Sequence, residues 1–287
     1  MYTKAVLIAL LIVATSAVYA GSLSNGFVHD DHFVVEENIW ITDTGHLADI
    51  FSSNVWNFTT DSHGSNYYRP TLHLFLLAAH HIFGPEPWGF HLMSLALHCL
   101  NVILVFLIVS RLCPGGSLLP FFSAILFSIH PVNTEAVSWV SSLSDLAYAL
   151  FYLLSFRLHL TALELKGAPR FLTLSLSALS LFFSLLSKET ALTFILLISA
   201  YDYLNERLSP KKTILYAPYL AAVLAYLALR IYSLGGFVET NLSVSPVAAL
   251  ITAPMLLARY IGKLLLPTNL SVVYDIRLQH SAADPRF

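Results

Sequence analysis

Eight stretches of the chain are almost entirely apolar and are separated by short polar segments. The clearest of them, residues 88–110, has no charged residue, and a helix crosses a bilayer with about 20 apolar residues. We expect each stretch to be a membrane-crossing helix, although 190–201 is short and crosses only if its polar flanks join the helix. The eight stretches are residues 1–20, 88–110, 112–129, 146–163, 171–187, 190–201, 213–229 and 246–266.

The first stretch has two interpretations. Lys4 precedes an apolar run that ends in the small-residue pattern Val18-Tyr19-Ala20, and a cleaved secretory signal has the same features. We favour an uncleaved first helix over residues 1–20.

The composition supports a membrane protein. The 287 residues are 56% hydrophobic and 11% charged, whereas a soluble domain has about 25% charged residues. Two cysteines, Cys99 and Cys113, are too few for a zinc cluster or a disulfide framework. We therefore predict an all-α polytopic membrane protein and exclude a soluble enzyme, a disordered chain and a disulfide scaffold. The net charge of −2 gives no indication of a nucleic-acid partner.

The segment 70–83 is apolar but too short to cross, and we expect it to be an amphipathic helix in the membrane interface. Pro70 at its start and Gly84 after its end are typical helix start and stop signals. If it does not cross, the positive-inside rule places eight cations inside and three outside before residue 245. The inner ones are Lys4, Arg111, Arg157, Lys166, Arg170, Arg207, Lys211 and Lys212, and the outer ones are Arg69, Lys188 and Arg230.

The predicted first outer loop, residues 21–87, is strongly acidic. It carries eight Asp or Glu residues against one basic residue, Arg69, and seven of the twelve histidines. Most of these acids are expected to be solvated. Asp30 and Asp31 differ because adjacent carboxylates repel each other, which favours a role as base or metal ligand.

Two further outer loops carry charged residues at the membrane edge. His130, Glu135 and Asp145 lie in or beside one of them, and Lys188 and Glu189 lie in the other. Charges near the membrane are costly and usually have a partner or a function. Helix capping or solvation is the simpler interpretation for the carboxylates, and the helix dipole alone suits Glu189.

Two rows of polar residues repeat at helical spacing. One, within 88–110, is expected to form hydrogen bonds between helices, because lipid cannot satisfy polar groups. The other lies along 70–83 and is suited either to a lipid phosphate or to simple headgroup anchoring. The first row is His91, Ser94, His98 and Asn101, and the second is Arg69, His73 and His80.

Several short motifs, in their order and spacing, resemble the TMTC proteins, the transmembrane and tetratricopeptide-repeat relatives of protein O-mannosyltransferases. The resemblance extends over nearly all of the chain. Its motifs are Phe27-Val28-His29-Asp30-Asp31, Asn66-Tyr67-Tyr68-Arg69-Pro70, Trp88-Gly89-Phe90-His91, Leu97-His98-Cys99-Leu100-Asn101, His130-Pro131-Val132-Asn133-Thr134-Glu135-Ala136-Val137 and Ser187-Lys188-Glu189-Thr190.

The resemblance implies a GT-C glycosyltransferase membrane domain, a helical bundle of about eight transmembrane helices. Such enzymes use a sugar carried on a polyprenyl or dolichyl phosphate, and act on the extracytoplasmic side on a hydroxyl of a protein or glycan. By this similarity Asp30 corresponds to the catalytic base, with Asp31 beside it, and Glu135 and Asp145 correspond to acidic residues around the active site. Lys188 and Glu189 match the next loop.

The chemistry of transfer suggests further roles. A base accepts the acceptor's proton, and cations stabilise the departing phosphate. We expect Arg69 and Lys188 to contact the phosphate, with Arg259 and Lys263 joining them if 246–266 faces outward. The spacing neither requires nor excludes a divalent metal between Asp30 and Glu135.

The competing hypotheses are a transporter or flippase and a truncated, inactive membrane scaffold. The first is less favoured because no inverted repeat is evident. No nucleotide-binding glycine loop, zinc-helix motif or serine elbow is present. We expect one domain over 1–287, made of a first helix (1–20), an outer loop (21–87), a helical bundle (88–266) and a tail (267–287) that belongs either to a truncated chain or to a minimal family member. The membrane is expected to be a bacterial cytoplasmic membrane or the endoplasmic reticulum.

Overall fold

The computed structural model describes residues 3–59, 65–207, 214–236, 246–272 and 274, and within these it is helical without any strand. This confirms the all-α prediction. The α-helices are α1 (Lys4–Tyr19), α2 (Leu47–Ser52), α3 (Pro70–Phe83), α4 (Pro87–Leu112), α5 (Leu118–Ile129), α6 (Thr134–Ser138), α7 (Leu143–Ala162), α8 (Ala168–Ser187), α9 (Phe194–Leu204), α10 (Ala217–Leu234) and α11 (Pro246–Leu265).

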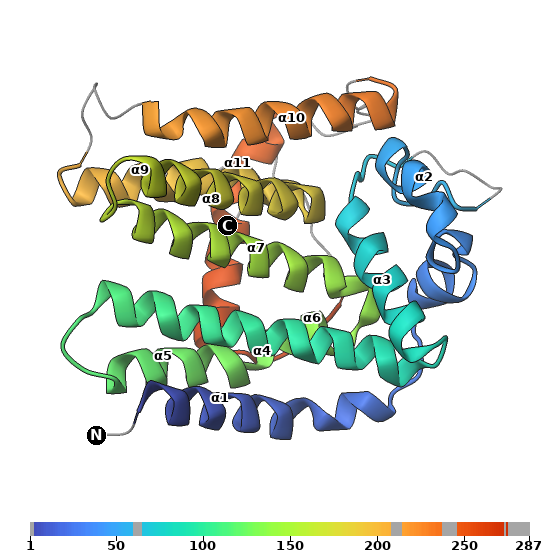
Figure 1. Ribbon diagram of the computed structural model, residues 1–287. Helices are drawn as coiled ribbons and strands as arrows, with labels where there is room; N and C mark the ends of the chain where they lie inside the picture. The colour runs from blue at the N-terminus through green and yellow to red at the C-terminus, as the bar shows by residue number, and fades with distance from the viewer. Residues whose placement is uncertain (1–2, 60–64, 208–213, 237–245, 273, 275–287) are drawn as a thin grey trace.

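The long helices form a bundle of roughly parallel and antiparallel rods (Figure 1). α7 packs along α8, while α4 packs against α5, α7 and α1, and α10 lies on α8. α11 crosses behind the bundle at a steep angle to the other helices (Figure 1). The first outer loop and α3 cover one end of the bundle, and this end carries the residues of interest.

The helices identify a multi-pass membrane protein, but with fewer crossings than expected. Among the described residues, four helical segments are long and apolar enough to cross a membrane: Lys4–Ser24, Pro87–Leu112, Ala168–Ser187 and Ile214–Leu234. A fifth exists if the segments Pro131–Ser138 and Val140–Ala162 are one span, although they meet at 102°. The sequence predicted about eight crossings from the lengths of the apolar stretches. Two of the helices that form in them, α5 and α9, have only 12 and 11 residues and are shorter than those stretches.

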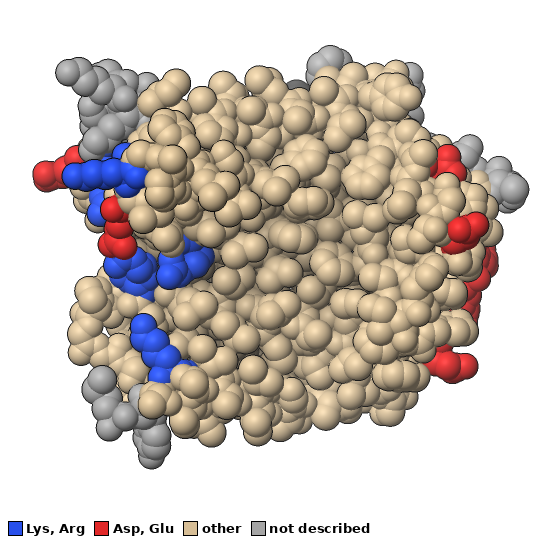
Figure 2. Space-filling model, in the orientation of Figure 1, with Lys and Arg blue, Asp and Glu red and all other residues tan. Residues whose placement is uncertain are grey.

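Charged side chains gather at the two ends of the bundle. Figure 2 shows the Lys and Arg side chains, with some Asp or Glu among them, at the end where the N-terminus lies, and only Asp and Glu among the charged side chains at the opposite end. Arg111, at the C-terminal end of α4, pairs with Glu164 in the α7–α8 connection. The separation agrees with the charge pattern that the sequence predicted. Lys211 and Lys212 lie outside the described residues, as does Asp61 in the first loop.

The first outer loop folds into a compact cap with its own apolar core. Val34, Trp40, Ile41 and Ile50 pack against α3 and the N-terminal half of α4. α3 has 14 residues, which span about 21 Å at 1.5 Å per residue, so it is too short to cross. One of its faces is buried against this cap and the bundle. The apolar core of the cap thereby holds its acidic residues near the ends of α4 and α7.

Candidate functional site

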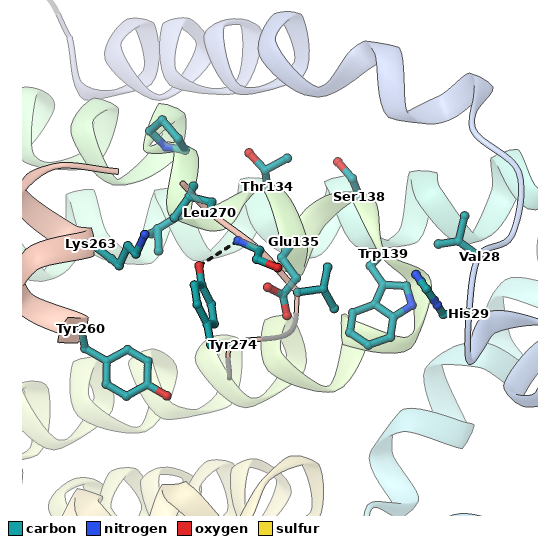
Figure 3. Close-up of a pocket in the computed structure, with 14 residues that line it drawn as sticks. Val28, His29, Thr134, Glu135, Ser138, Trp139, Tyr260, Lys263, Leu270 and Tyr274 are labelled. Atoms are coloured by element: carbon teal, nitrogen blue, oxygen red, sulfur yellow. Dashed lines mark hydrogen bonds between the residues drawn. The ribbon is translucent and has the colours of Figure 1, made fainter. Parts of the chain in front are cut away.

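A cavity of about 450 Å³ lies between the first outer loop, α6 and α11 (Figure 3). Its walls are mostly apolar and aromatic, with a few polar side chains. Pockets of this size and character are typical binding sites for small molecules. It is lined by Val28, His29, Pro131, Val132, Thr134, Glu135, Ser138, Trp139, Tyr260, Lys263, Leu270, Ser271, Val272 and Tyr274.

α6 carries the acidic side chain of the cavity. Pro131 begins the helical turn before it, and Nδ1 of His130 accepts a hydrogen bond from the Val132 amide at 3.2 Å. Nε2 of His130 lies 3.0 Å from the Leu264 carbonyl of α11. His130 therefore joins two walls of the cavity. Figure 3 shows Glu135 pointing into the space between Trp139 and Tyr274.

Glu135 belongs to a charge cluster built from three elements. Asp145, in the first turn of α7, accepts a hydrogen bond from Nζ of Lys188 at 2.5 Å. α6 is bent away from α7, so Glu135 lies outside the crossing helix. Burial raises the pKa of Glu135 above its ordinary value and the Asp145 charge raises it further, while Lys188 opposes both. The structure thus brings together Glu135, Asp145 and Lys188, which the sequence predicted from separate loops.

The two adjacent aspartates of the first loop have different environments. The buried Asp31 carboxylate accepts hydrogen bonds from the Ser141 amide at 2.8 Å, the Ser141 hydroxyl at 2.6 Å and the Val28 amide at 3.2 Å. Asp30 is exposed, and in the described part of the chain its carboxylate makes neither a hydrogen bond nor an ion pair. His29 has a φ of 51°, a left-handed conformation uncommon for a non-glycine residue, and lines the cavity. The Asp31 carboxylate is therefore held in structural hydrogen bonds, whereas Asp30, the residue after the cavity-lining His29, is exposed.

A second group of charges surrounds the hydroxyl of Tyr226. Arg69 lies over the Tyr67 ring at 4.4 Å and 3.6 Å from the Glu189 carboxylate. Nε of Arg69 and Oε2 of Glu189 are buried without a hydrogen-bond partner among the residues that the structure describes. Arg230 donates to the Tyr226 hydroxyl at 3.4 Å. Arg69 and Glu189, which the sequence singled out separately, are therefore in contact, and among the described residues each retains unused hydrogen-bonding capacity.

The histidines of α3 do not extend Arg69 into a phosphate-binding row. His73 is buried, with Nδ1 3.0 Å from the Asn38 amide nitrogen and Nε2 3.1 Å from the Val55 carbonyl. Burial lowers the pKa of His73 to about 4, against a smaller opposing effect of the Val55 contact. His73 is thus neutral with both nitrogens occupied. His80 lies near the other end of α3, beside His81.

The two cations of α11 share one face, as their spacing predicted. Arg259 and Lys263 flank a narrow pocket of about 50 Å³ together with Tyr260 and Tyr274. Nζ of Lys263 donates to the carbonyls of Thr268 and Asn269 at 2.5 and 2.8 Å. Lys263 therefore holds the segment that follows α11 and also lines the larger cavity.

Two of the four residues in the polar row within α4 form the predicted hydrogen bonds between helices, whereas the side chains of His91 and Ser94 have no hydrogen-bond partner among the described residues. Nε2 of His98 lies 3.0 Å from the Ser128 carbonyl of α5, and the Asn101 amide donates to the Leu146 carbonyl of α7 at 3.0 Å. His91 and Ser94 are buried as well.

Several cavity residues have no strong signal in the sequence. His29 is next to Asp30 and Trp139 is four residues after Glu135, and this proximity along the chain is the only local indication. Tyr260 and Tyr274 reach the cavity from far along the chain. Among the described residues, no group of three His, Cys, Asp or Glu side chains is arranged to hold a metal ion.

No family model matches the chain, and no solved structure matches it. It is similar to curated proteins named protein O-mannosyl-transferase. To Tmtc1 of Drosophila melanogaster it is 34% identical over 193 residues, which are 65% of this chain and 21% of the relative. To Tmtc2 of the same organism it is 32% identical over 192 residues, 65% of this chain and 20% of the relative. To TMTC2 of Homo sapiens it is 29% identical over 189 residues, 65% of this chain and 22% of the relative.

The matched part of the chain spans about a fifth of the length of these relatives. Their names agree with the resemblance that the sequence motifs carry. The protein is a multi-pass membrane protein, and over 65% of its length it is similar to the TMTC protein O-mannosyl-transferases.

Proposed function

We propose that this protein is a membrane glycosyltransferase that moves a hexose, with mannose favoured, from a polyprenyl or dolichyl phosphate to a hydroxyl acceptor such as Ser or Thr of a protein. The reaction takes place on the extracytoplasmic side, of either a bacterial cytoplasmic membrane or the endoplasmic reticulum. The curated relatives are named for protein O-mannosyl transfer, and this supports the sugar and the acceptor class.

The observation that carries the proposal is the composition of the large cavity. Aromatic and aliphatic walls suit a lipid-linked sugar, and Glu135, His29 and Lys263 supply a few polar groups among them. The free carboxylate of Asp30 follows His29 directly in the chain. A lipid-carried sugar needs this combination of apolar surface and localised charge, because its two ends differ in polarity.

The proposed reaction is a single displacement. The acceptor oxygen forms a bond to the anomeric carbon while the bond from that carbon to the phosphate oxygen breaks, and the electron pair leaves with the lipid phosphate. Asp30 takes the hydroxyl proton of the acceptor, a contribution of about 10²–10⁴-fold for a well-placed general base. One direct attack inverts the anomeric centre.

Cations near the cavity stabilise the departing phosphate. Lys188 and Arg69 are each shared with a carboxylate, Asp145 and Glu189, so a phosphate competes with an existing partner for each of them. Lys263, with Arg259 beside it, takes this role from the α11 wall. Charge stabilisation of this kind acts on the negative charge that grows as the bond to phosphate breaks.

Glu135 is proposed to contact the sugar rather than the phosphate. Its pKa is raised, so it is more readily protonated than an ordinary carboxyl group and can donate a hydrogen bond to a sugar hydroxyl. A protonated Glu135 also avoids repulsion with the phosphate.

The test uses the purified chain in lipid nanodiscs with radiolabelled polyprenyl phosphate mannose and Ser- and Thr-containing peptides. The expected result is label on the peptide, with the anomeric configuration opposite to that of the donor by NMR of the product. Retention of configuration contradicts the single displacement. Movement of the donor across the bilayer without any transfer favours the flippase instead.

A further inference from the structure

Trp139 forms a fixed wall of the large cavity. Its amide donates to the Glu135 carbonyl at 3.0 Å, and its carbonyl accepts from the Ser142 amide at 3.1 Å. The residues that follow, Val140 and Ser142, are buried. The backbone of Trp139 is thus held on both sides, and its indole lines the cavity (Figure 3).

The indole nitrogen of Trp139 has no acceptor. Nε1 is buried and makes no hydrogen bond in the described part of the chain. A buried donor without a partner destabilises the folded state, and such groups in native structures usually have a specific reason. An acceptor that arrives with a ligand is such a reason.

His29 lines the same cavity as Trp139. Figure 3 shows the His29 ring beside the indole nitrogen. His29 is exposed, its φ of 51° is unusual for a histidine, and its ring makes no hydrogen bond within the described residues. A histidine held so weakly can change rotamer at low cost, which uncovers Nε1 from the cavity side.

The side chains around Trp139 are suited to a hexose. A pyranose has a face of C–H groups that packs on an aromatic ring and a rim of hydroxyls that needs hydrogen-bond partners, and an indole offers both a large apolar face and a polar N–H group. Glu135, four residues earlier, points into the same space. Lys263 and Tyr274 lie on the α11 side of the cavity, where a phosphate and the start of a lipid chain would follow.

We propose that Trp139 is the platform for the hexose of the lipid-linked donor, with the indole face under the sugar ring and Nε1 donating to a sugar hydroxyl once His29 has turned away. This inference rests on the proposed function, because it takes the donor class from it. It assigns sugar recognition to Trp139 and a covering role to His29.

The experiment compares two probes with the full chain in nanodiscs. One is a short-chain polyprenyl phosphate mannose, and the other is the same lipid with a methyl group in place of the mannose, so that both carry one negative charge. The ratio of their dissociation constants, measured by thermophoresis, isolates the contribution of the sugar. The variants are Trp139→Phe, Trp139→Ala and His29→Ala. The matched control is Trp88→Phe, at an exposed tryptophan that packs on Phe83 and does not line the cavity.

We expect the wild type and Trp88→Phe to prefer the mannosyl lipid to the same extent. Trp139→Phe retains an aromatic face but loses the donor, and lowers the ratio about threefold to tenfold, the share of one hydrogen bond. Trp139→Ala brings the ratio close to one. His29→Ala raises it, because the cover is gone.

An unchanged ratio in Trp139→Ala overturns the platform, and an unchanged ratio in Trp139→Phe overturns the role of Nε1. A lower ratio in His29→Ala overturns the covering role. If Trp139→Ala fails to fold, Trp139→Phe decides the question, and retained binding of the methyl lipid reports folding in each case. A protein that prefers the mannosyl lipid through Trp139 but transfers no sugar keeps this site and loses the proposed function. A protein that transfers sugar but shows an unchanged ratio in both Trp139→Phe and Trp139→Ala keeps the proposed function and loses the Trp139 site.

Discussion

The carboxylate of Asp31 accepts two hydrogen bonds from Ser141, one from its amide at 2.8 Å and one from its hydroxyl at 2.6 Å, across 110 positions of sequence. A third bond, from the Val28 amide at 3.2 Å, closes a tight turn in the first loop. These bonds join the first outer loop to the segment before α7. They hold the turn that carries His29, which lines the cavity that Glu135 enters, and Asp30, the next residue along the chain.

Removal of the Asp31 carboxylate is expected to destabilise the fold. In Asp31→Ala the Ser141 amide and hydroxyl lose their buried acceptor, at a cost of about 1–3 kcal/mol in the free energy of unfolding. Thermal unfolding in detergent measures this loss. Asp30→Asn is the matched control because the Asp30 carboxylate is exposed, and it should change stability by no more than about 0.5 kcal/mol. Equal stability of the two variants would show that the hydrogen bonds between Asp31 and Ser141 do not stabilise the fold.

The raised pKa of Glu135 predicts a pH dependence of donor binding. A polyprenyl phosphate sugar carries one negative charge throughout the relevant range, so its binding strengthens when Glu135 is protonated. Affinity therefore increases as the pH falls through the raised pKa of Glu135. Lys188→Gln removes the cation that opposes this shift and moves the transition to higher pH, whereas Asp145→Asn moves it to lower pH.

The control for this experiment is Glu135→Gln. With no titrating group at this position, the donor affinity should lose its pH dependence in that range, as measured by thermophoresis with the mannosyl lipid. If the pH dependence of donor affinity persists in Glu135→Gln, a group other than Glu135 causes it. If Lys188→Gln and Asp145→Asn moved the pH of the transition in the same direction, the proposed interaction of Glu135 with both side chains would be contradicted.

His73 predicts a loss of stability in acid. Its pKa is about 4 in the folded protein against an ordinary value of 6.5, so the unfolded chain binds the proton first. The stability is fully present above pH 6.5 and decreases as the pH falls from there towards 4, by about 3 kcal/mol in total. Thermal unfolding between pH 7.5 and 4.5 should show a smaller slope for His73→Gln than for the wild type. The exposed His32 gives the comparison variant His32→Gln, and a slope reduced equally by both would assign the effect to general charging of the protein.

Arg69 and Glu189 predict opposite effects on the donor. The two side chains are in loose contact at 3.6 Å, and a phosphate that binds Arg69 has to compete with Glu189. Arg69→Gln should weaken binding of polyprenyl phosphate about tenfold, and Glu189→Gln should strengthen it, because Arg69 is then unshared. Binding at low and high salt measures both, and the difference between the variants should shrink as salt screens the charges. A loss of affinity in both variants would mean that the pair is only structural.

The sequence predicted the long uncharged helices well. The stretch 88–110 corresponds to α4 (Pro87–Leu112), and 171–187 lies within α8 (Ala168–Ser187), because neither charged residues nor proline interrupt either run. The prediction for the stretch 112–129 was less accurate. Its first residues contain Pro114, Gly115 and Gly116, and α5 begins only at Leu118. A proline and two glycines outweigh hydrophobicity in deciding where that helix starts.

The site was predictable in its residue types but not in its contacts. The sequence singled out the adjacent pair Asp30 and Asp31, yet only the packing of Ser141 against it decides which of the two is buried. His73 shared a helix face with Arg69, but its partners Asn38 and Val55 lie in the folded cap. Such long-range contacts leave no trace in helical spacing.

The most direct test of the account is the rate of sugar transfer by Asp30→Asn compared with the wild type, at saturating polyprenyl phosphate mannose and with donor binding measured in parallel. We predict that kcat falls at least about 100-fold while thermal stability and donor affinity stay at the wild-type level. Undiminished transfer by Asp30→Asn would contradict the account, because the exposed carboxylate next to the cavity-lining His29 would then not be the base.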